Sequence, residues 1–158
     1  VIACNAAISA CEKAGQWEHA LKLLAEALQK GPAIDIITFS AAISACEKGR
    51  QWRWALGLLW KMQQYDLQPD LIACNAAISA CQVGKQWGWA LAVLGEMRQA
   101  SMNLDVVTYS AVISACEKGL EWCRAMGILS EVPQCRLRPN TITLNAAISA
   151  CEKCGKWQ

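Results

Sequence analysis

Several residue types and patterns that would indicate a function are scarce in this chain of 158 residues. It has one histidine, one phenylalanine and two tyrosines. No apolar run reaches the 18 or so residues that a membrane-spanning helix needs, and no secretory leader opens the chain. The net charge is only +2, with 54% hydrophobic residues, which excludes a disordered chain and a strongly basic nucleic-acid tail. Because the chain lacks an initiator Met and begins within a repeating pattern, we expect it to be a piece of a longer protein.

The ten cysteines are abundant, but their spacing argues against a disulfide scaffold. Five of them recur at intervals of 35 residues: Cys11, Cys46, Cys81, Cys116 and Cys151. Equivalent positions in stacked repeats lie about one repeat apart, which is too far for the Cα separation of a disulfide. We therefore predict reduced cysteines packed as small apolar residues in the core, and a reducing compartment.

The whole chain repeats at 35 residues without a gap. The rows cover residues 1–35, 36–70, 71–105, 106–140 and a partial row, 141–158. Positions within a row are called columns here, so that row one has the chain's own numbers. Columns 8 to 11 read Ile-Ser-Ala-Cys in every row, and column 17 is always Trp. A fixed period of this length indicates a repeat architecture.

Each row predicts two helices. Apolar residues at columns 4, 7, 8 and 11 and again at columns 17, 20, 21 and 24 have helical spacing. A glycine at column 14 or 15 separates the two stripes, and Pro32, Pro69 and Pro139 mark the end of the second. Pro133 should shorten or kink the second helix of row four. The predicted fold is an all-α solenoid of stacked 35-residue helix-turn-helix repeats, one solenoid over residues 1–158.

The tryptophans of column 17 are predicted to pack in the core between helices. Trp54, Trp60 and Trp89 lie off that stripe and either pack between neighbouring second helices or lie exposed. The last row supplies a first helix and only the start of a second, so we expect Trp157 to be poorly buried.

The row openings and endings resemble those of pentatricopeptide repeats. Ile37-Thr38-Phe39-Ser40 and Val107-Thr108-Tyr109-Ser110 open rows two and four, and Leu67-Gln68-Pro69-Asp70 closes row two. The resemblance implies a right-handed α-solenoid that binds single-stranded RNA, one base per repeat. It also implies a role in organellar RNA processing, stability, editing or translation, with other RNA-processing proteins as further partners. Chloroplasts are favoured over mitochondria.

The same resemblance assigns base recognition to column 5 together with the last column of each row. The implied pairs are Asn5 with Asp35, Ser40 with Asp70, Asn75 with Asp105, and Ser110 with Asn140, and Asn145 opens a fifth. All nine side chains are small and polar, which we interpret as more than helix patterning requires. The family's preferences (Asn with Asp for U, Ser with Asp for G, Ser with Asn for A) predict U-G-U-A, read from the RNA 5′ end.

Two further columns acquire roles by the resemblance, each with an alternative left open. Column 2 would clamp base faces or simply pack between repeats: Ile2, Ile37, Ile72, Val107 and Ile142. Column 13 would contact phosphates or be an ordinary solvated helix position, often paired with the adjacent glutamate: Lys13, Lys48, Lys118 and Lys153, with Val83 as the exception. The low net charge gives RNA binding no support.

A protein- or peptide-binding scaffold is the alternative function, which the polar pairs of column 5 and the last column argue against. An enzyme is not expected within this chain, and any catalytic domain would lie outside it. His19 stands alone and Cys151 with Cys154 forms a lone CxxC, so we predict no metal site, no cofactor and no small-molecule substrate. No membrane partner is predicted either.

Overall fold

A computed structural model describes residues 2–30 and 34–155 of the chain, and within these ranges every regular element is helical. The first helices of the five rows are α1 Ile2–Lys13, α3 Ile36–Lys48, α5 Leu71–Val83, α7 Val106–Lys118 and α9 Thr141–Lys153. The second helices are α2 Trp17–Lys30, α4 Trp52–Gln64, α6 Trp87–Gln99 and α8 Trp122–Glu131, and a 3₁₀ turn, η1 Pro133–Cys135, follows α8. The all-α solenoid of helical hairpins predicted from the sequence is confirmed. Trp157 lies outside the described residues.

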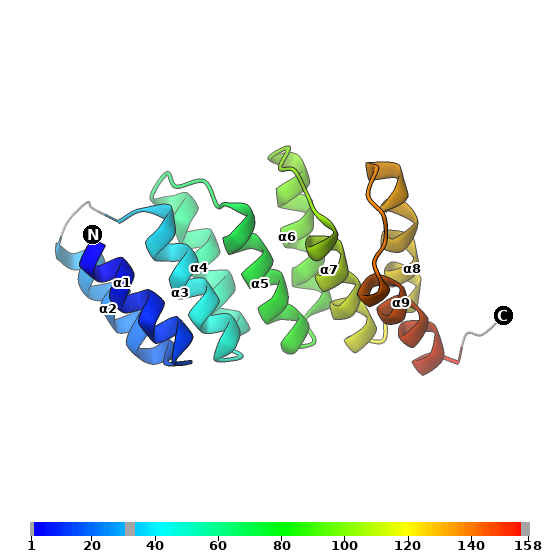
Figure 1. Cartoon of the computed structure of the whole chain (residues 1–158), viewed down its shortest axis with the longest axis horizontal. Helices are drawn as coiled ribbons and strands as arrows, with labels where there is room; N and C mark the ends of the chain where they lie inside the picture. The colour runs from blue at the N-terminus through cyan, green and yellow to red at the C-terminus, as the bar shows by residue number, and fades with distance from the viewer. Residues whose placement is uncertain (1, 31–33, 156–158) are drawn as a thin grey trace. The chain divides into compact units, whose positions relative to one another are not determined.

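The chain divides into two compact units, Val1–Ala80 and Cys81–Gln158, called here the N-terminal and C-terminal units. In the N-terminal unit, α1 packs against α3 in one layer, and α2 and α4 pack behind them (Figure 1). In the C-terminal unit, α7 packs against α9, and α6 and α8 pack behind α7. Each unit therefore repeats the same arrangement, with first helices side by side and second helices covering their apolar face.

The periodic apolar stripes form the core of each unit. In the N-terminal unit, Ile8, Leu24, Phe39 and Ile43 are buried, as are Tyr109 and Ile113 in the C-terminal unit. The column-8 isoleucine of the last row is the exception: Ile148 is 60% exposed, since no second helix follows α9 within the described residues. One-sided stripes of this kind leave each hairpin dependent on its neighbours for burial.

The prediction of core cysteines is confirmed for three of the five that recur at 35 residues, whereas Cys11 and Cys151 are half-buried. All ten are free, and Cys46, Cys81 and Cys116 are fully buried in the first-helix layer. Burial disfavours the thiolate and raises the pKa of Cys46 and Cys81 to about 12 and that of Cys116 to about 11. These thiols are therefore protonated at neutral pH and serve as packing groups.

The column-17 tryptophans are less enclosed than the core position predicted for them. Trp17, Trp52, Trp87 and Trp122 are the first residues of the second helices, and all four are only half-buried. The Trp17 indole lies over Gly49, where an added Cβ would sit 2.6 Å from Trp17 Cγ. Trp87 covers Gly119 in the same way, with a Cβ position 2.9 Å from its Cγ. The indole thus packs against the hairpin turn of the following repeat.

This contact also explains why glycine stands at column 14. Gly49 and Gly119 have negative φ values of −76° and −84°, which any residue adopts. The left-handed residue of each hairpin turn is instead at column 15, and it is Arg50 and Leu120 in those two rows. In rows two and four, glycine is required at column 14 because a tryptophan lies where a Cβ would point.

The remaining tryptophans divide between the two alternatives left open by the sequence. Trp54 and Trp89 are 53% and 44% exposed on α4 and α6, whereas Trp60 is half-buried.

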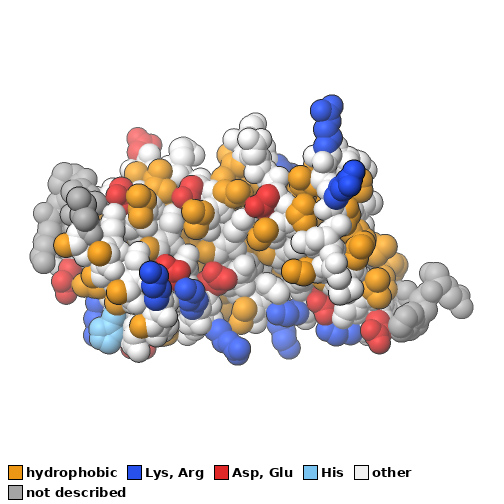
Figure 2. All heavy atoms as spheres, viewed as in Figure 1, with side chains coloured by type: hydrophobic (Ala, Val, Ile, Leu, Met, Phe, Trp, Pro, Cys, Tyr) orange, Lys and Arg blue, Asp and Glu red, His pale blue; other side chains and the backbone are white. Residues whose placement is uncertain are grey.

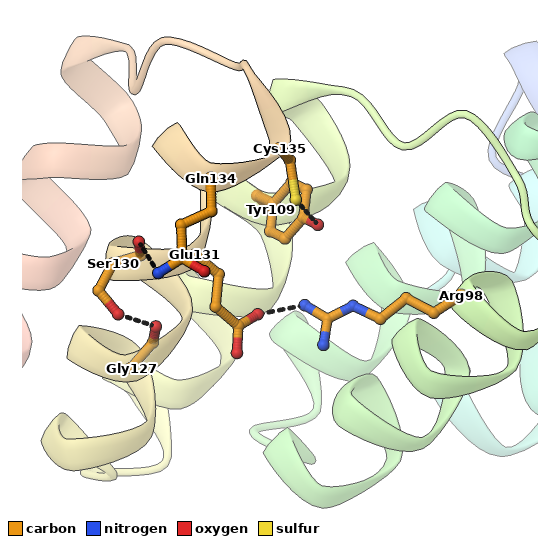
Figure 3. Close-up of polar contacts among 7 residues, drawn as sticks. All are labelled: Arg98, Tyr109, Gly127, Ser130, Glu131, Gln134 and Cys135. Atoms are coloured by element: carbon orange, nitrogen blue, oxygen red, sulfur yellow. Dashed lines mark hydrogen bonds and ion pairs between the residues drawn. The ribbon is translucent and has the colours of Figure 1, made fainter.

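Pro133 shortens the second helix of row four, as predicted. Helix α8 has 10 residues and ends at Glu131, and η1 begins with the proline. The tighter turn places Cys135 Sγ 3.3 Å from the Tyr109 hydroxyl of α7 (Figure 3). At the end of α8, Glu131 forms an ion pair with Arg98 of α6, which joins the two second helices.

Candidate nucleic-acid interface

The last residue of each row is the N-cap of the next first helix. Asp35 Oδ1 accepts the Thr38 N–H at 2.9 Å, Asp105 Oδ1 accepts the Thr108 N–H at 2.8 Å, and Asn140 Oδ1 accepts the Thr143 N–H at 2.8 Å. Asp70 caps α5 in the same manner through the Ala73 N–H, also at 2.8 Å. Capping favours Asp and Asn because their side-chain oxygen satisfies an unpaired N–H of the first turn. The small polar side chains were interpreted from the sequence as more than helix patterning requires. For the last column this was wrong, because these residues are the N-caps of the following helices.

The same capping side chains meet column 5 of their own row. The Asn5 amide nitrogen donates to both carboxylate oxygens of Asp35, at 3.2 and 3.1 Å. The Ser40 hydroxyl lies 3.1 Å from Asp70 Oδ1, and the Ser110 hydroxyl lies 3.4 Å from Asn140 Oδ1. Three of the four pairs suggested by the sequence are thus side by side. Each pair joins the first helix of one row to the start of the next row.

The fourth pair is divided between the two units, and the fifth position stands on the last helix. Asn75 lies in the N-terminal unit and Asp105 in the C-terminal unit. Asn145 is exposed on α9.

A threonine at column 3 completes two of these pairs and was missed by the sequence reasoning. The Thr38 hydroxyl lies against Asn5 Oδ1 and 2.7 Å from Asp35 Oδ1. In the C-terminal unit, the Thr143 hydroxyl lies 2.7 Å from Asn140 Oδ1 and 2.6 Å from the Ser110 hydroxyl. The sequence signal is a Thr three residues after the row-ending Asp or Asn, which recurs in rows two, four and five.

Column 3 is buried where it is threonine. Thr38, Thr108 and Thr143 are at most 1% exposed, and their hydroxyls are among the few buried polar side chains. In row three the position is Ala73, so Asp70 meets the Ser40 hydroxyl with no threonine hydroxyl beside it. A buried polar group with fixed partners holds the neighbouring side chains in one orientation.

This hydrogen-bond network favours the ionised form of Asp35. Burial opposes ionisation, but the hydrogen bonds from the Thr38 hydroxyl and N–H and from Asn5 outweigh it and lower the pKa of the carboxyl. Asp35 is therefore a carboxylate at neutral pH, which accepts hydrogen bonds and donates none.

The two serines of column 5 are more enclosed than the asparagines. Ser40 and Ser110 are 6% and 7% exposed. Each hydroxyl also lies 2.8 or 2.7 Å from a carbonyl oxygen of its own helix, Ile36 O or Val106 O. A serine has a single hydroxyl hydrogen, so the more accessible recognition group of each pair is the row-ending Asp or Asn.

The aliphatic residues of column 2 project into solvent. Ile37, Ile72, Val107 and Ile142 are 60–64% exposed, and the Ile2 side chain lies outside the described residues. Inter-repeat packing would have buried them. Figure 2 shows exposed hydrophobic and acidic side chains together on the side of the first helices. Large aliphatic side chains beside hydrogen-bonding groups suit contact with a flat ring.

The lysines of column 13 lie at the opposite end of the first helices. Lys48 Nζ is 2.9 Å from Glu12 Oε1, and Lys153 Nζ is 2.7 Å from Glu117 Oε1. Lys13 and Lys118 are exposed. Because a helix turns 100° per residue, columns 2, 5, 9, 12 and 13 share one face, called here the first-helix face.

Within residues 2–30 and 34–155, no group of three or more His, Cys, Asp and Glu side chains is arranged to hold a metal ion. None of the described helices combines the length and the apolar character needed to cross a bilayer.

Stacked helical hairpins of 35 residues, each beginning with a capped first helix, define the class of helical-repeat solenoid proteins. The family model for the pentatricopeptide repeat domain matches residues 57–119 and 92–153, and that for the PPR repeat matches residues 2–32 and 37–67. The chain belongs to the pentatricopeptide repeat family. No curated protein gives a significant match.

Solved structures of this family have the same fold. The pentatricopeptide repeat protein PPR10 from maize superposes with a TM-score of 0.84 at 19% identity, over 99% of this chain and 22% of that one. PPR10 in complex with an 18-nt psaJ RNA element gives 0.79 at 25% identity, over 96% and 23%. The PPR domain of Arabidopsis thaliana protein-only RNase P 1 in complex with tRNA gives 0.81 at 13% identity, over 92% and 77%. The chain thus spans less than a quarter of the length of PPR10.

Proposed function

We propose that this chain binds single-stranded RNA on its first-helix face, one base per repeat. The observation that carries the proposal is the contact between column 5 and the row-ending residue in three repeats. Each contact leaves an Asp or Asn beside an exposed aliphatic residue of the next row, as with Asp35 and Ile37. A base could stack on the aliphatic side chain while its edge meets the polar one.

The side chains suggest which bases are read. An Asp carboxylate only accepts hydrogen bonds, and the ring N–H of uracil or guanine is a donor on the Watson–Crick edge. An Asn amide can also donate, as the ring nitrogen N1 of adenine requires. The row-ending residues therefore fit the family preference U-G-U-A, with an aspartate for U or G and Asn140 for A, while column 5 would separate U from G.

The biological setting belongs to the same proposal. Family membership supports a role in organellar RNA processing, stability, editing or translation, with chloroplasts favoured over mitochondria. The relatives in complex with psaJ RNA and with tRNA support RNA as the partner class.

The test compares the 158-residue chain on short unstructured RNAs that contain UGUA or a scrambled order of the same bases. Fluorescence anisotropy should show tighter binding to UGUA by about tenfold or more, since each unpaired buried donor costs about 1–3 kcal/mol. Equal affinity for the two RNAs would reject the base assignment. Absence of RNA binding, with binding to peptides instead, would support the protein-scaffold alternative.

A further inference from the structure

Two ion pairs link successive first helices at the end opposite the base-reading pairs. Lys48 pairs with Glu12 and Lys153 with Glu117, and in both cases the lysine follows the glutamate by 36 residues. The glutamate of column 12 therefore pairs with the lysine of column 13 in the next repeat. The lysines remain about half exposed, at 47% and 48%, while Glu12 and Glu117 are 25% and 15% exposed.

The third repeat departs from this pattern at both positions. Four rows have Glu-Lys at columns 12 and 13, but row three has Gln82-Val83. Lys118 follows Gln82 by the same 36 residues, so its expected carboxylate partner is replaced by a neutral amide. Among the described residues, Lys118 makes no ion pair and its side chain is exposed.

The second change in row three is at column 13 and concerns Glu47. Val83 follows Glu47 by 36 residues, so a valine stands where the other rows have the lysine. Burial and the nearby Glu12 carboxylate raise the pKa of Glu47, against smaller opposing effects of Lys48 and Ser79. Burial also opposes ionisation of Glu117, but its hydrogen bonds from Lys153 and Ser149 outweigh burial and lower its pKa. The Glu117 carboxylate is therefore stabilised by Lys153 of the next repeat, together with Ser149 and Lys118.

A paired lysine is a poor phosphate ligand. Its charge is already compensated, and a phosphate that approaches it also approaches the glutamate oxygens 2.9 or 2.7 Å away. Within the described part of the chain, Lys118 lacks such an ion pair across the repeats, and only the Coulombic attraction of the adjacent Glu117 acts on its charge. Both columns lie on the first-helix face, so an RNA strand that follows this face passes them.

We propose that the residue at column 12 decides which lysine of this chain contacts an RNA phosphate. Glu12 and Glu117 retain Lys48 and Lys153 in links between repeats, and Gln82 leaves Lys118 available as a phosphate ligand. Column 12 thereby tunes affinity without touching the base-reading pairs. This inference rests on the proposed RNA binding.

The decisive variant is Gln82→Glu, which gives Lys118 the carboxylate that the other lysines have. The slope of log affinity against log salt should become shallower by about 0.7, the value for one single-strand phosphate contact. The corresponding loss at 0.1 M salt is about fivefold. In a Lys118→Ala background, Gln82→Glu should leave the slope unchanged. Gln99→Glu is the matched control, since it makes the same charge change on an exposed residue of second helix α6.

The converse variant is Glu12→Gln, which releases Lys48. The slope should steepen by about 0.7 when Lys48 is present and stay constant when it is Ala. Glu96→Gln on α6 is its control. Circular dichroism melting of each variant establishes that it is folded before binding is compared.

The outcomes separate the inference from the function on which it rests. If the unmodified chain binds RNA and Gln82→Glu has the same affinity and slope as the Gln99→Glu control, the assignment of column 12 is overturned. If the unmodified chain binds no RNA at any salt concentration, the proposed function fails and this inference fails with it.

Discussion

Asn140 accepts two hydrogen bonds from Thr143 on the same side-chain oxygen, from the N–H at 2.8 Å and from the hydroxyl at 2.7 Å. The oxygen is thereby turned toward the start of α9, and the amide nitrogen remains as a donor. One residue thus caps a helix and presents the group that an adenine reader needs.

The first prediction concerns the Thr143 hydroxyl, which can be removed while Asn140 still caps α9 through the Thr143 N–H. Thr143→Val retains the shape and the backbone N–H but loses the hydrogen bonds to Asn140 and Ser110. The free energy of unfolding should fall by about 1 kcal/mol, the usual contribution of one such hydrogen bond. Urea denaturation measures it. Thr141→Val, an exposed position of the same helix, should change stability by less than about 0.5 kcal/mol. Equal effects at the two positions would show that the buried hydroxyl contributes nothing.

The second prediction concerns the contact between a tryptophan and the next turn. Gly49→Ala places a methyl group against the Trp17 indole, so overpacking should cost about 1–3 kcal/mol. Gly57→Ala in the middle of α4 meets no atom within 4 Å and should instead stabilise the chain by about 0.5–1 kcal/mol. Thermal unfolding of the two variants therefore shifts in opposite directions. A stabilising Gly49→Ala would contradict the packing described for Trp17.

The third prediction compares two glutamates at column 12. The pKa of Glu117 is lowered, so its stabilising contribution is present above its ordinary value of 4.5 and is lost as the pH falls through the folded value. The pKa of Glu47 is raised, so its contribution is present below 4.5 and is lost as the pH rises through the folded value.

At pH 7, Glu117→Gln should therefore destabilise the chain, by roughly 0.5–1 kcal/mol for a partly exposed pair. Glu47→Gln should stabilise it. Urea denaturation at pH 7 and at pH 4 checks both signs, because each difference from the unmodified chain should shrink in acid. The same sign for both variants at pH 7 would contradict the account of column 12.

The sequence was sufficient for the helices and their order because apolar periodicity and turn residues are local signals. It was insufficient for residues whose role depends on the neighbouring repeat. Glycine at column 14 was interpreted as a turn former, whereas Gly49 is required by Trp17 of the preceding row. The tryptophans were assigned to the core because of their size, yet their place at the first turn of a helix leaves them half-buried.

The candidate site was predicted in part. The pairs formed by Asn5, Ser40 and Ser110 were identified through the family resemblance, but the capping role of their partners was not. Thr38 and Thr143 were missed because their recurrence at column 3 marks the repeat but does not show that the hydroxyl meets the column-5 side chain of the preceding row. The links from Glu12 to Lys48 and from Glu117 to Lys153 were missed for another reason. Both require knowledge of which ends of successive helices meet.

The central claim is that the row-ending side chain selects the base, and Asp70→Asn tests it most directly. The cap of α5 should survive, since Asn140 caps α9 in this chain with the same 2.8 Å contact. The Ser40 pair then has the composition of the Ser110 pair. Competition between short RNAs that contain UGUA or UAUA should show the preference moving from UGUA to UAUA, by about tenfold or more. An unchanged preference for UGUA in a variant of unchanged stability would contradict the account.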